Sequence, residues 1–403
     1  MLIVRSCHYF LLKQSDMIEC RRAAKEGGIW VLSFEKQFRI DPTHLPAEKN
    51  RILRQARDAM QRPIAHITDV TAPLSEGTIH DFYSNGDYWW PDPEKADGLP
   101  YIQRDGQTNP DNFIAHRLAM RQMRTDVVSL SIAYALTGDP AYAGHGVRIL
   151  EEFFLDPKTR MNPNLNYAQA IPGICAGRGI GIIDTLHLIE VPFAIERLKH
   201  RGGMTERCYA GLKDWFAEYL GWMLTSSNGI QEMNAANNHG VCFFAQAAVF
   251  ALFTDNQLLV DFCRQHYKKV LLEQMDADGS FPRELARTKP YNYSIFVIDN
   301  MVTLCYLLST PKENLWEYPN QKGADIRKGL DFITPYLIDK SLWPYPKDVM
   351  YFEDFPVRSS FLVFAGCVLG REELLELYQR LPYPFTPEEV SRNNAIQEPV
   401  FLL

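Results

Sequence analysis

Several motifs that mark common protein classes are missing from this chain of 403 residues. No apolar run is long enough to span a membrane, and the eight cysteines are scattered without a C-x-x-C pair. The motifs of zinc proteases (H-E-x-x-H), P-loop proteins (G-x-x-x-x-G-K-[ST]) and serine hydrolases (G-x-S-x-G) do not occur. These absences argue against a membrane-spanning protein, a disulfide framework and those three enzyme classes.

Signals for a cofactor are missing as well. Histidines and acidic residues nowhere show the spacing of metal ligands, and the stretch Gly177–Gly181 lacks the strand and spacing of a dinucleotide site. We therefore expect no metal and no other cofactor.

Composition and charge narrow the choice of partners. The formal charge is −7 with acids and bases mixed along the chain, which argues against a nucleic-acid-binding surface. A local group of arginines can still steer an acidic sugar, and 12% of the residues are aromatic, the side chains on which sugar rings stack. Apolar residues make up 46% of the chain, which is ample for a large core.

The first residues carry little targeting information. Met1–Leu12 has no clean apolar core and no small-residue cleavage site, so it does not resemble a signal peptide. As written, the sequence predicts a cytoplasmic protein. A periplasmic or secreted location is the alternative if the start of the chain is assigned wrongly.

The chain divides into regions of different character. Residues 1–45 show no period and are interpreted as an N-terminal extension, whereas 68–113 form a long loop rich in Asp, Gly, Pro and aromatics. A loop of this length is usually functional, and its aromatics argue against disorder. The remaining sequence predicts a series of apolar helices separated by short turns, which is typical of an all-α helical array or toroid. The stretch Trp343–Phe355 is expected to be partly extended. The predicted helices are 48–60, 115–137, 141–154, 173–199, 205–225, 235–253, 256–275, 292–309, 324–339 and 358–379.

Three asparagines and a histidine precede an apolar helix in the segment Asn234–Gly240. Because Asn is a good helix cap, one interpretation of this segment is a purely structural capping cluster. In the functional interpretation, Asn238 and His239 project from the helix start into a cleft. There the amide can hydrogen-bond a substrate carboxylate that becomes enolate-like as its α-proton leaves.

A second segment, Asp276–Ser294, places two tyrosines after a proline at the start of another apolar helix. Its structural interpretation is a solvated loop in which Glu284 and Arg287 form an i,i+3 ion pair. In the functional interpretation, Arg287 holds a carboxylate and a tyrosine moves protons. An amide, an imidazole, a guanidinium and a phenol together favour β-elimination on a uronic acid polymer, because none of them repels an acidic substrate.

These two segments resemble the alginate lyase superfamily of polysaccharide lyases. The resemblance rests on Asn238-His239-Gly240 and on Glu284-Leu285-Ala286-Arg287-Thr288-Lys289-Pro290 followed by Tyr293-Ser294, and it covers most of residues 70–380. It implies an incomplete α/α toroid of about six to seven helical hairpins, with 46–403 as a single catalytic domain and the long aromatic loop as a lid. It also implies that the catalytic residues are Asn238, His239, Arg287 and Tyr293, with Tyr291 as a competing phenol because the Arg-to-Tyr spacing varies in the family.

Other polar and aromatic residues are candidates for holding the sugar chain. Aromatic rings can stack on sugars, and polar groups can bind hydroxyls or a neighbouring carboxylate; the alternatives are core packing and helix capping. His116, His187 and Glu190 are expected to be structural. The candidates are Tyr88, Trp89, Trp90, Asn166, Tyr167, Gln169, Arg178, Asn237 and Tyr291.

The sequence therefore predicts a lyase that cleaves a 1,4-linked polyuronate such as alginate or glucuronan. Asn238, His239 and Arg287 would stabilise the carboxylate while Tyr293 moves the protons. In mannuronate and glucuronate the C5 hydrogen and the C4 oxygen lie on the same side of the sugar ring, so one phenol can serve both proton transfers. In guluronate they lie on opposite sides, which requires a separate base such as His239. The alternatives are an α/α-toroid glycoside hydrolase acting on unsaturated uronides, which needs two opposed carboxylates, and a non-catalytic carbohydrate-binding protein.

Overall fold

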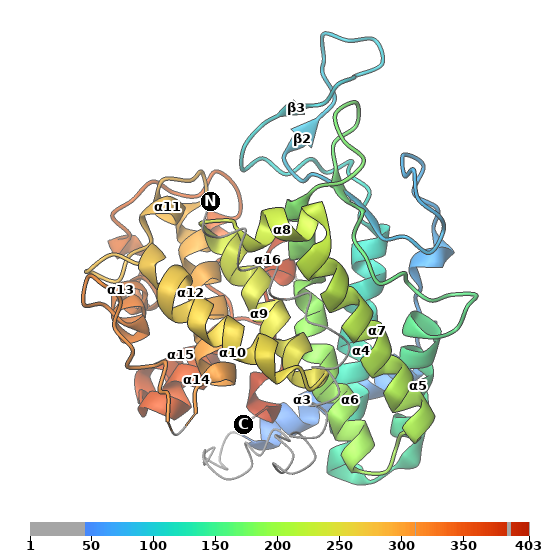
Figure 1. The fold of residues 1–403 in the computed structure, drawn as a ribbon. Coiled ribbons are helices and arrows are strands. Elements are labelled where there is room, and N and C mark those ends of the chain that lie inside the picture. Colours follow the sequence, from blue (N-terminus) through green and yellow to red (C-terminus); the bar gives the residue numbers. More distant parts are fainter. Residues whose placement is uncertain (1–44, 311, 385–387, 403) are drawn as a thin grey trace. The chain divides into compact units, whose positions relative to one another are not determined.

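Helices dominate the part of the chain that the structure describes (Figure 1). The computed structural model describes residues 45–402 except 311 and 385–387, so the predicted N-terminal extension lies almost entirely outside the described residues. The described residues belong to one compact unit, Ile40–Leu402. Among them, no helix combines the length and apolar character needed to cross a membrane.

The α-helices are α3 (Leu45–Gln61), α4 (Ala115–Thr137), α5 (Pro140–Phe154), α6 (Glu190–His200), α7 (Glu206–Thr225), α8 (Ser227–Met233), α9 (Asn238–Phe253), α10 (Gln257–His266), α11 (Pro282–Leu285), α12 (Pro290–Leu308), α13 (Ile326–Ile338), α14 (Ser360–Leu369), α15 (Glu372–Arg380) and α16 (Glu388–Arg392).

Helices α9 and α12 form the centre of this array. They pack against each other, and α9 also contacts α7, α8 and α10 while α12 contacts α13 and α14. Within α12, every residue except Tyr293 is buried. Within α9, only His239 and Leu252 are not buried. Each of these two helices therefore leaves one titratable side chain, His239 or Tyr293, only partly buried in its first turn.

The starts of both central helices are fixed by polar contacts. The Asn237 side chain caps α9 by accepting a hydrogen bond from the His239 backbone N–H at 3.3 Å. At the start of α12, the Asp348 carboxylate accepts from the backbone N–H groups of Tyr291 (2.8 Å) and Asn292 (2.9 Å). Such contacts satisfy N–H groups that a helix start leaves unpaired, so they hold the first turns in place.

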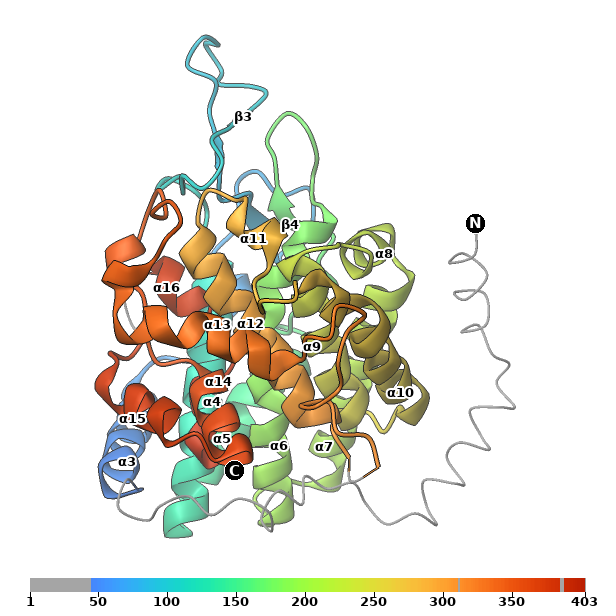
Figure 2. The same ribbon diagram turned by 90° about the vertical axis from the view of Figure 1, so that its left-hand side faces the viewer.

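The described strands are short and belong to the long loop and its neighbour. Strand β1 (Tyr83–Asn85) pairs in parallel with β4 (Tyr167–Ala170), and β2 (Trp89–Trp90) pairs antiparallel with β3 (Ile102–Gln103). The β2–β3 ribbon lies at the same end of the helical array as α8 and α11 (Figure 1), and the turned view agrees (Figure 2). The loop 68–113 therefore reaches the end of the array where α9 and α12 begin.

The predicted helix positions hold for most of the array, with two corrections. The predicted helix 173–199 is in fact a turn followed by the 3-10 helix η4 (Gly179–Ile189) and then α6, because Pro172 and the left-handed Gly173 (φ +79°) break the helical path. The predicted helix 358–379 is two helices, since Gly370 (φ +65°) ends α14. As expected, Trp343–Phe355 is partly extended: Trp343 and Phe355 have extended backbone angles, and the stretch contains the short 3-10 helix η8 (Phe352–Asp354) but no strand.

Candidate active site

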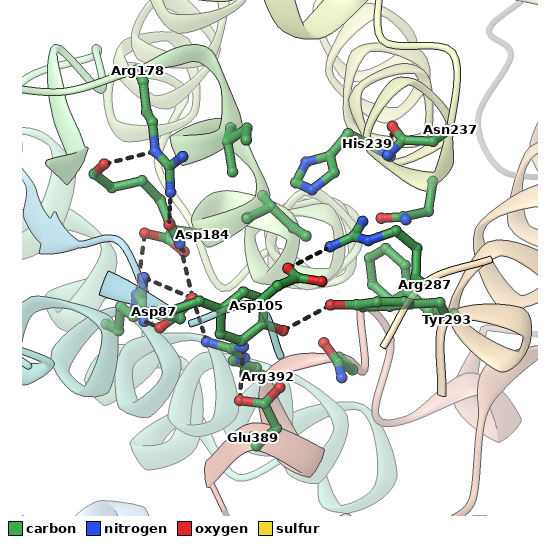
Figure 3. A pocket seen from close by; sticks show the side chains of 18 of the residues that line it. Asp87, Asp105, Arg178, Asp184, Asn237, His239, Arg287, Tyr293, Glu389 and Arg392 are labelled. Carbon is green, nitrogen blue, oxygen red and sulfur yellow. Dashed lines mark hydrogen bonds and ion pairs between the residues drawn. The ribbon is translucent and has the colours of Figure 1, made fainter. Parts of the chain in front are cut away.

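A pocket lies where the loop 68–113, η4, α16 and the first turns of α9 and α12 come together. All four predicted catalytic residues line it: Asn238, His239, Arg287 and Tyr293. Five of the predicted substrate-binding residues line it as well, namely Tyr88, Trp89, Gln169, Arg178 and Asn237. Segments that are far apart in the sequence thus contribute to one site (Figure 3).

The Tyr293 phenol has two close neighbours that lower its pKa. Its hydroxyl lies 2.8 Å from the hydroxyl of Tyr88, and the Arg287 guanidinium carbon lies 4.8 Å from the centre of its ring. Burial raises the pKa of Tyr293 to about 12, although the Arg287 charge and the Tyr88 hydrogen bond both oppose this increase. The phenol is therefore protonated at rest, with two neighbours that stabilise the phenolate once it forms.

The His239 imidazole is paired with a buried carboxylate. Its Nδ1 lies 2.6 Å from Oε1 of Glu232, which is 2% exposed and comes from the end of α8. Burial lowers the pKa of His239, but the charge and hydrogen bond of Glu232 outweigh it, so that the pKa is raised above its usual value. This pairing favours the imidazolium form and leaves Nε2 as the free donor; the ring faces the pocket in Figure 3.

Asn238 is held by a second buried carboxylate. Its backbone N–H and its side-chain Nδ2 both donate to Glu284, at 2.7 and 2.6 Å. Because a carboxylate accepts from the amide nitrogen, this contact fixes which way the Asn238 amide is turned. Burial raises the pKa of Glu284, and the hydrogen bonds from Asn238 lower it only in part.

Arg287 pairs with the aromatic loop rather than with Glu284. Its Nη2 lies 3.2 Å from Oδ1 of Asp105, and the other oxygen of Asp105 accepts from the Thr288 hydroxyl at 2.9 Å. The i,i+3 ion pair between Glu284 and Arg287 considered from the sequence is not formed. Asp105 instead holds the guanidinium beside the Tyr293 ring.

A network of buried ion pairs lines one side of the pocket. Asp87 contacts Nη1 of Arg117 and Nη1 of Arg392, each at 2.6 Å, and Arg392 also pairs with Glu389 at 2.7 Å. Although burial raises the pKa of Asp87, the two arginines hold it well below its usual range. Arg117 makes a further ion pair with Asp184 at 3.1 Å. Figure 3 shows this network on the side of the pocket away from His239.

Four predicted substrate-binding residues lie outside the pocket. Trp90 donates from Nε1 to the Gln107 carbonyl at 3.0 Å, and the exposed Asn166 accepts from Trp222 at 3.0 Å. Tyr167 packs against the small cluster of Ala72, Tyr83 and Ala170. The competing phenol Tyr291 is fully buried: its hydroxyl donates to the Tyr336 carbonyl at 2.9 Å, and its ring contacts Trp343 and Phe352.

Several residues at the site had no assigned role in the sequence analysis. Asp184 gives a usable signal, because an acid in an apolar stretch usually has a buried partner. His187, expected to be structural, lines the pocket, and burial lowers its pKa well below the usual value. Glu232 gives no such signal, because a turn separates it from His239. Arg392 has a local signal in its i,i+3 spacing to Glu389 on α16, but its other partner, Asp87, is distant in sequence. In the described part of the chain, no group of three or more His, Cys, Asp and Glu is placed to hold a metal ion.

Comparison with known proteins identifies the family. The family described as Alginate lyase matches residues 67–343, which is more than half of the chain. The chain belongs to the alginate lyase family. It is therefore a polysaccharide lyase, and neither the glycoside hydrolase nor the non-catalytic alternative holds. No curated protein matches the chain.

Solved structures of this family share the fold. An alginate lyase from Bacteroides ovatus is 34% identical with a TM-score of 0.78, and the match covers 90% of this chain and 93% of that one. Alginate lyase A1-III from Sphingomonas species A1 is 16% identical with a TM-score of 0.51, over 80% of this chain and 88% of that one. A tyrosine-to-phenylalanine variant of alginate lyase A1-III, complexed with a tetrasaccharide, is 14% identical with a TM-score of 0.53, over 79% and 86% of the two chains. The predicted all-α fold, an α/α toroid, is confirmed; at such low identity the A1-III structures support the fold alone.

Proposed function

We propose that this polysaccharide lyase cleaves a 1,4-linked polyuronate by β-elimination, with Tyr293 as both base and acid. The observation that carries the proposal is the position of Tyr293 as the one residue of α12 that is not buried, in a pocket shared with His239, Asn238 and Arg287. The tetrasaccharide in the A1-III complex agrees with a sugar chain as substrate.

Three other residues of the pocket stabilise the substrate carboxylate. Arg287 supplies a fixed positive charge, His239 donates from Nε2 in its imidazolium form, and the Asn238 amide adds a neutral hydrogen bond. Their combined effect grows as the C5 proton leaves, because negative charge then moves onto the carboxylate oxygens. Removing one such donor typically costs about 10²–10³ in rate.

The Tyr293 oxygen moves one proton through the whole reaction. The resting phenol first gives its proton to solvent, a step that the neighbouring Arg287 charge favours. The phenolate then takes the proton from C5, and as a phenol it returns that proton to the C4 oxygen. The C5–H electron pair forms the C4–C5 double bond while the C4–O pair leaves with the glycosidic oxygen. The phenolate is regenerated at the end, so that no redox partner and no external proton are needed.

This arrangement favours mannuronate and glucuronate over guluronate. In the first two sugars the C5 hydrogen and the C4 oxygen lie on one side, within reach of one phenol. Guluronate needs a base on the opposite side. His239 is poorly suited to that role, because Glu232 raises its pKa and favours the protonated form.

One assay tests the proposal. The protein is incubated with polymannuronate, polyguluronate and glucuronan while near-ultraviolet absorbance is followed, because elimination creates a double bond conjugated to the carboxylate. We expect absorbance to rise fastest with polymannuronate or glucuronan, and dialysis against EDTA beforehand to leave the rate unchanged. New reducing ends without the chromophore would contradict elimination, and a clear preference for polyguluronate would contradict the single-phenol mechanism.

A further inference from the structure

Five arginines line the pocket, and they differ in whether they form an ion pair. Four of them are paired with carboxylates. Arg178 is the exception: within the described part of the chain, its guanidinium makes no ion pair. The pairs of the other four are Arg117 with Asp87 and Asp184, Arg121 with Glu388, Arg287 with Asp105, and Arg392 with Asp87 and Glu389.

Arg178 is nevertheless held in a defined orientation. Its Nε donates to the Gln169 backbone carbonyl at 3.0 Å and its Nη2 donates to the Gln169 side-chain oxygen at 3.2 Å. The Gln169 amide cannot turn around, because its nitrogen donates to Asp87 (3.0 Å) and Asp184 (3.3 Å). A guanidinium has five N–H donors, so about three of them have no partner among the described residues.

The surroundings of Arg178 suit a sugar that carries a charge. The Trp89 ring centre lies 5.9 Å from the Arg178 guanidinium carbon, which places an apolar ring beside the free donors. Gly86 makes this arrangement possible, because a Cβ there would lie 2.6 Å from Cδ1 of Trp89 and 2.9 Å from Nη2 of Arg178. Sugar rings stack on indole faces, and guanidinium groups bind carboxylates with two parallel hydrogen bonds.

Arg178 and Arg287 lie on different sides of the pocket, with His239 between them in the view of Figure 3. One carboxylate at Arg287 would therefore leave Arg178 unpaired. A partly buried cation without a counter-ion is unfavourable. A ligand carboxylate that binds Arg178 therefore contributes more binding free energy than one that binds an arginine already paired with a carboxylate.

We propose that Arg178 binds the carboxylate of a second uronate, next to the one that reacts, so that the pocket selects polymers with carboxylates on consecutive sugars. This inference rests on the proposed function, which assigns the first carboxylate to Arg287, His239 and Asn238. Arg178 acts on binding and has no part in the proton transfers at Tyr293.

The test compares Arg178→Gln with the unmodified protein on two substrates. One is the polyuronate on which the unmodified protein is fastest, and the other is the same polymer with part of its carboxylates reduced to alcohols. Because a hydrogen bond to a charged group is worth about 1.5–3 kcal/mol, we expect KM for the fully charged polymer to rise by roughly 10–100-fold, with a smaller change in kcat. The preference for the fully charged polymer should shrink in this variant, and Arg178→Lys should recover part of it.

Arg197 offers a matched control. It also lacks a carboxylate partner at ion-pair distance in the described structure, and it donates to the Ser131 hydroxyl (2.9 Å) and the Phe401 carbonyl (2.8 Å), but it lies on α6 outside the pocket. Arg197→Gln should leave both KM and the preference unchanged.

The outcomes separate this inference from the proposed function. If Arg178→Gln matches Arg197→Gln, or loses activity equally on both polymers, the second-carboxylate site is wrong while the lyase mechanism stands. If the unmodified protein produces no chromophore from any polyuronate, the proposed function itself fails.

Discussion

The pocket is built from two regions of different construction: the first turns of α9 and α12, and the loop 68–113. The helix starts emerge from the core, and buried carboxylates hold two of their side chains: Glu232 lies behind His239 and Glu284 behind Asn238. The loop contributes through polar contacts, with Asp87 in a buried ion network and the Tyr88 hydroxyl against that of Tyr293. Beyond Tyr88, its β2–β3 ribbon carries half-buried aromatics. This difference supports the proposal that the helix starts perform the chemistry, while the loop completes the pocket and contacts the sugar.

The strongest test of this division compares two tyrosines two positions apart on α12. Tyr293→Phe should lower kcat by about 10²–10⁴-fold with little change in KM, because it removes the group that transfers the proton. Tyr291→Phe should keep kcat and lower the free energy of unfolding by about 1 kcal/mol, since it loses only the hydrogen bond to the Tyr336 carbonyl. Steady-state kinetics and thermal melting measure both effects. An inactive Tyr291→Phe beside an active Tyr293→Phe would reverse the assignment of the phenol.

The next largest effects are expected for Asn238 and Arg287, which we propose bind the reacting carboxylate. Asn238→Ala or Arg287→Ala should each lower kcat by about 10²–10³-fold, because each removes a partner of the developing charge. The measurement is the initial rate of chromophore formation at saturating polymer. A tenfold or smaller loss for both variants would place the carboxylate elsewhere in the pocket.

A smaller effect is expected for the carboxylate behind His239. Glu232→Gln should lower kcat at neutral pH by about five- to tenfold, because a neutral amide is a weaker partner for the imidazolium. The direction of the pH effect follows from the raised pKa of His239: activity that needs the imidazolium is lost as pH rises through that pKa. Without the Glu232 charge the pKa falls, so the loss should begin at a lower pH.

The half-buried pair of His66 and Glu152, whose Nε2 and Oε2 lie 2.9 Å apart, is the control for this variant. Glu152→Gln breaks the same kind of contact outside the pocket and should leave the pH profile of kcat unchanged. Equal profiles for Glu232→Gln and the unmodified protein would show that His239 does not act as a charged donor.

The difference between the helix starts and the loop 68–113 also explains which parts of the site could be predicted from the sequence. The first turns of α9 and α12 are recognisable because Asn, Gly and Pro punctuate long apolar helices, and these local signals depend on neighbouring residues. The contacts of Glu284 with Asn238 and of Asp105 with Arg287 join segments far apart in the chain, so no local pattern reveals them. The loop was recognisable as a region, but its contacts depend on how it folds over the helices. Trp90 and Tyr291 therefore lie outside the pocket although their neighbours Trp89 and Tyr293 line it.

The smallest expected effect concerns the loop and compares its two adjacent tryptophans. Trp89 lines the pocket, whereas Trp90 faces the Gln107 carbonyl and the Arg104 guanidinium, whose carbon lies 4.8 Å from its ring centre. Trp89→Ala should raise KM for the polymer by about 3–10-fold, because ring contacts of this kind contribute about 0.5–1.5 kcal/mol, and Trp90→Ala should raise it less. Both variants should melt close to the unmodified protein, since both rings are only half-buried and belong to a two-residue strand. A large loss of thermal stability with an unchanged KM for Trp89→Ala would instead show that the ring supports the fold, and the loop would then serve the pocket only through Asp87, Tyr88 and Asp105.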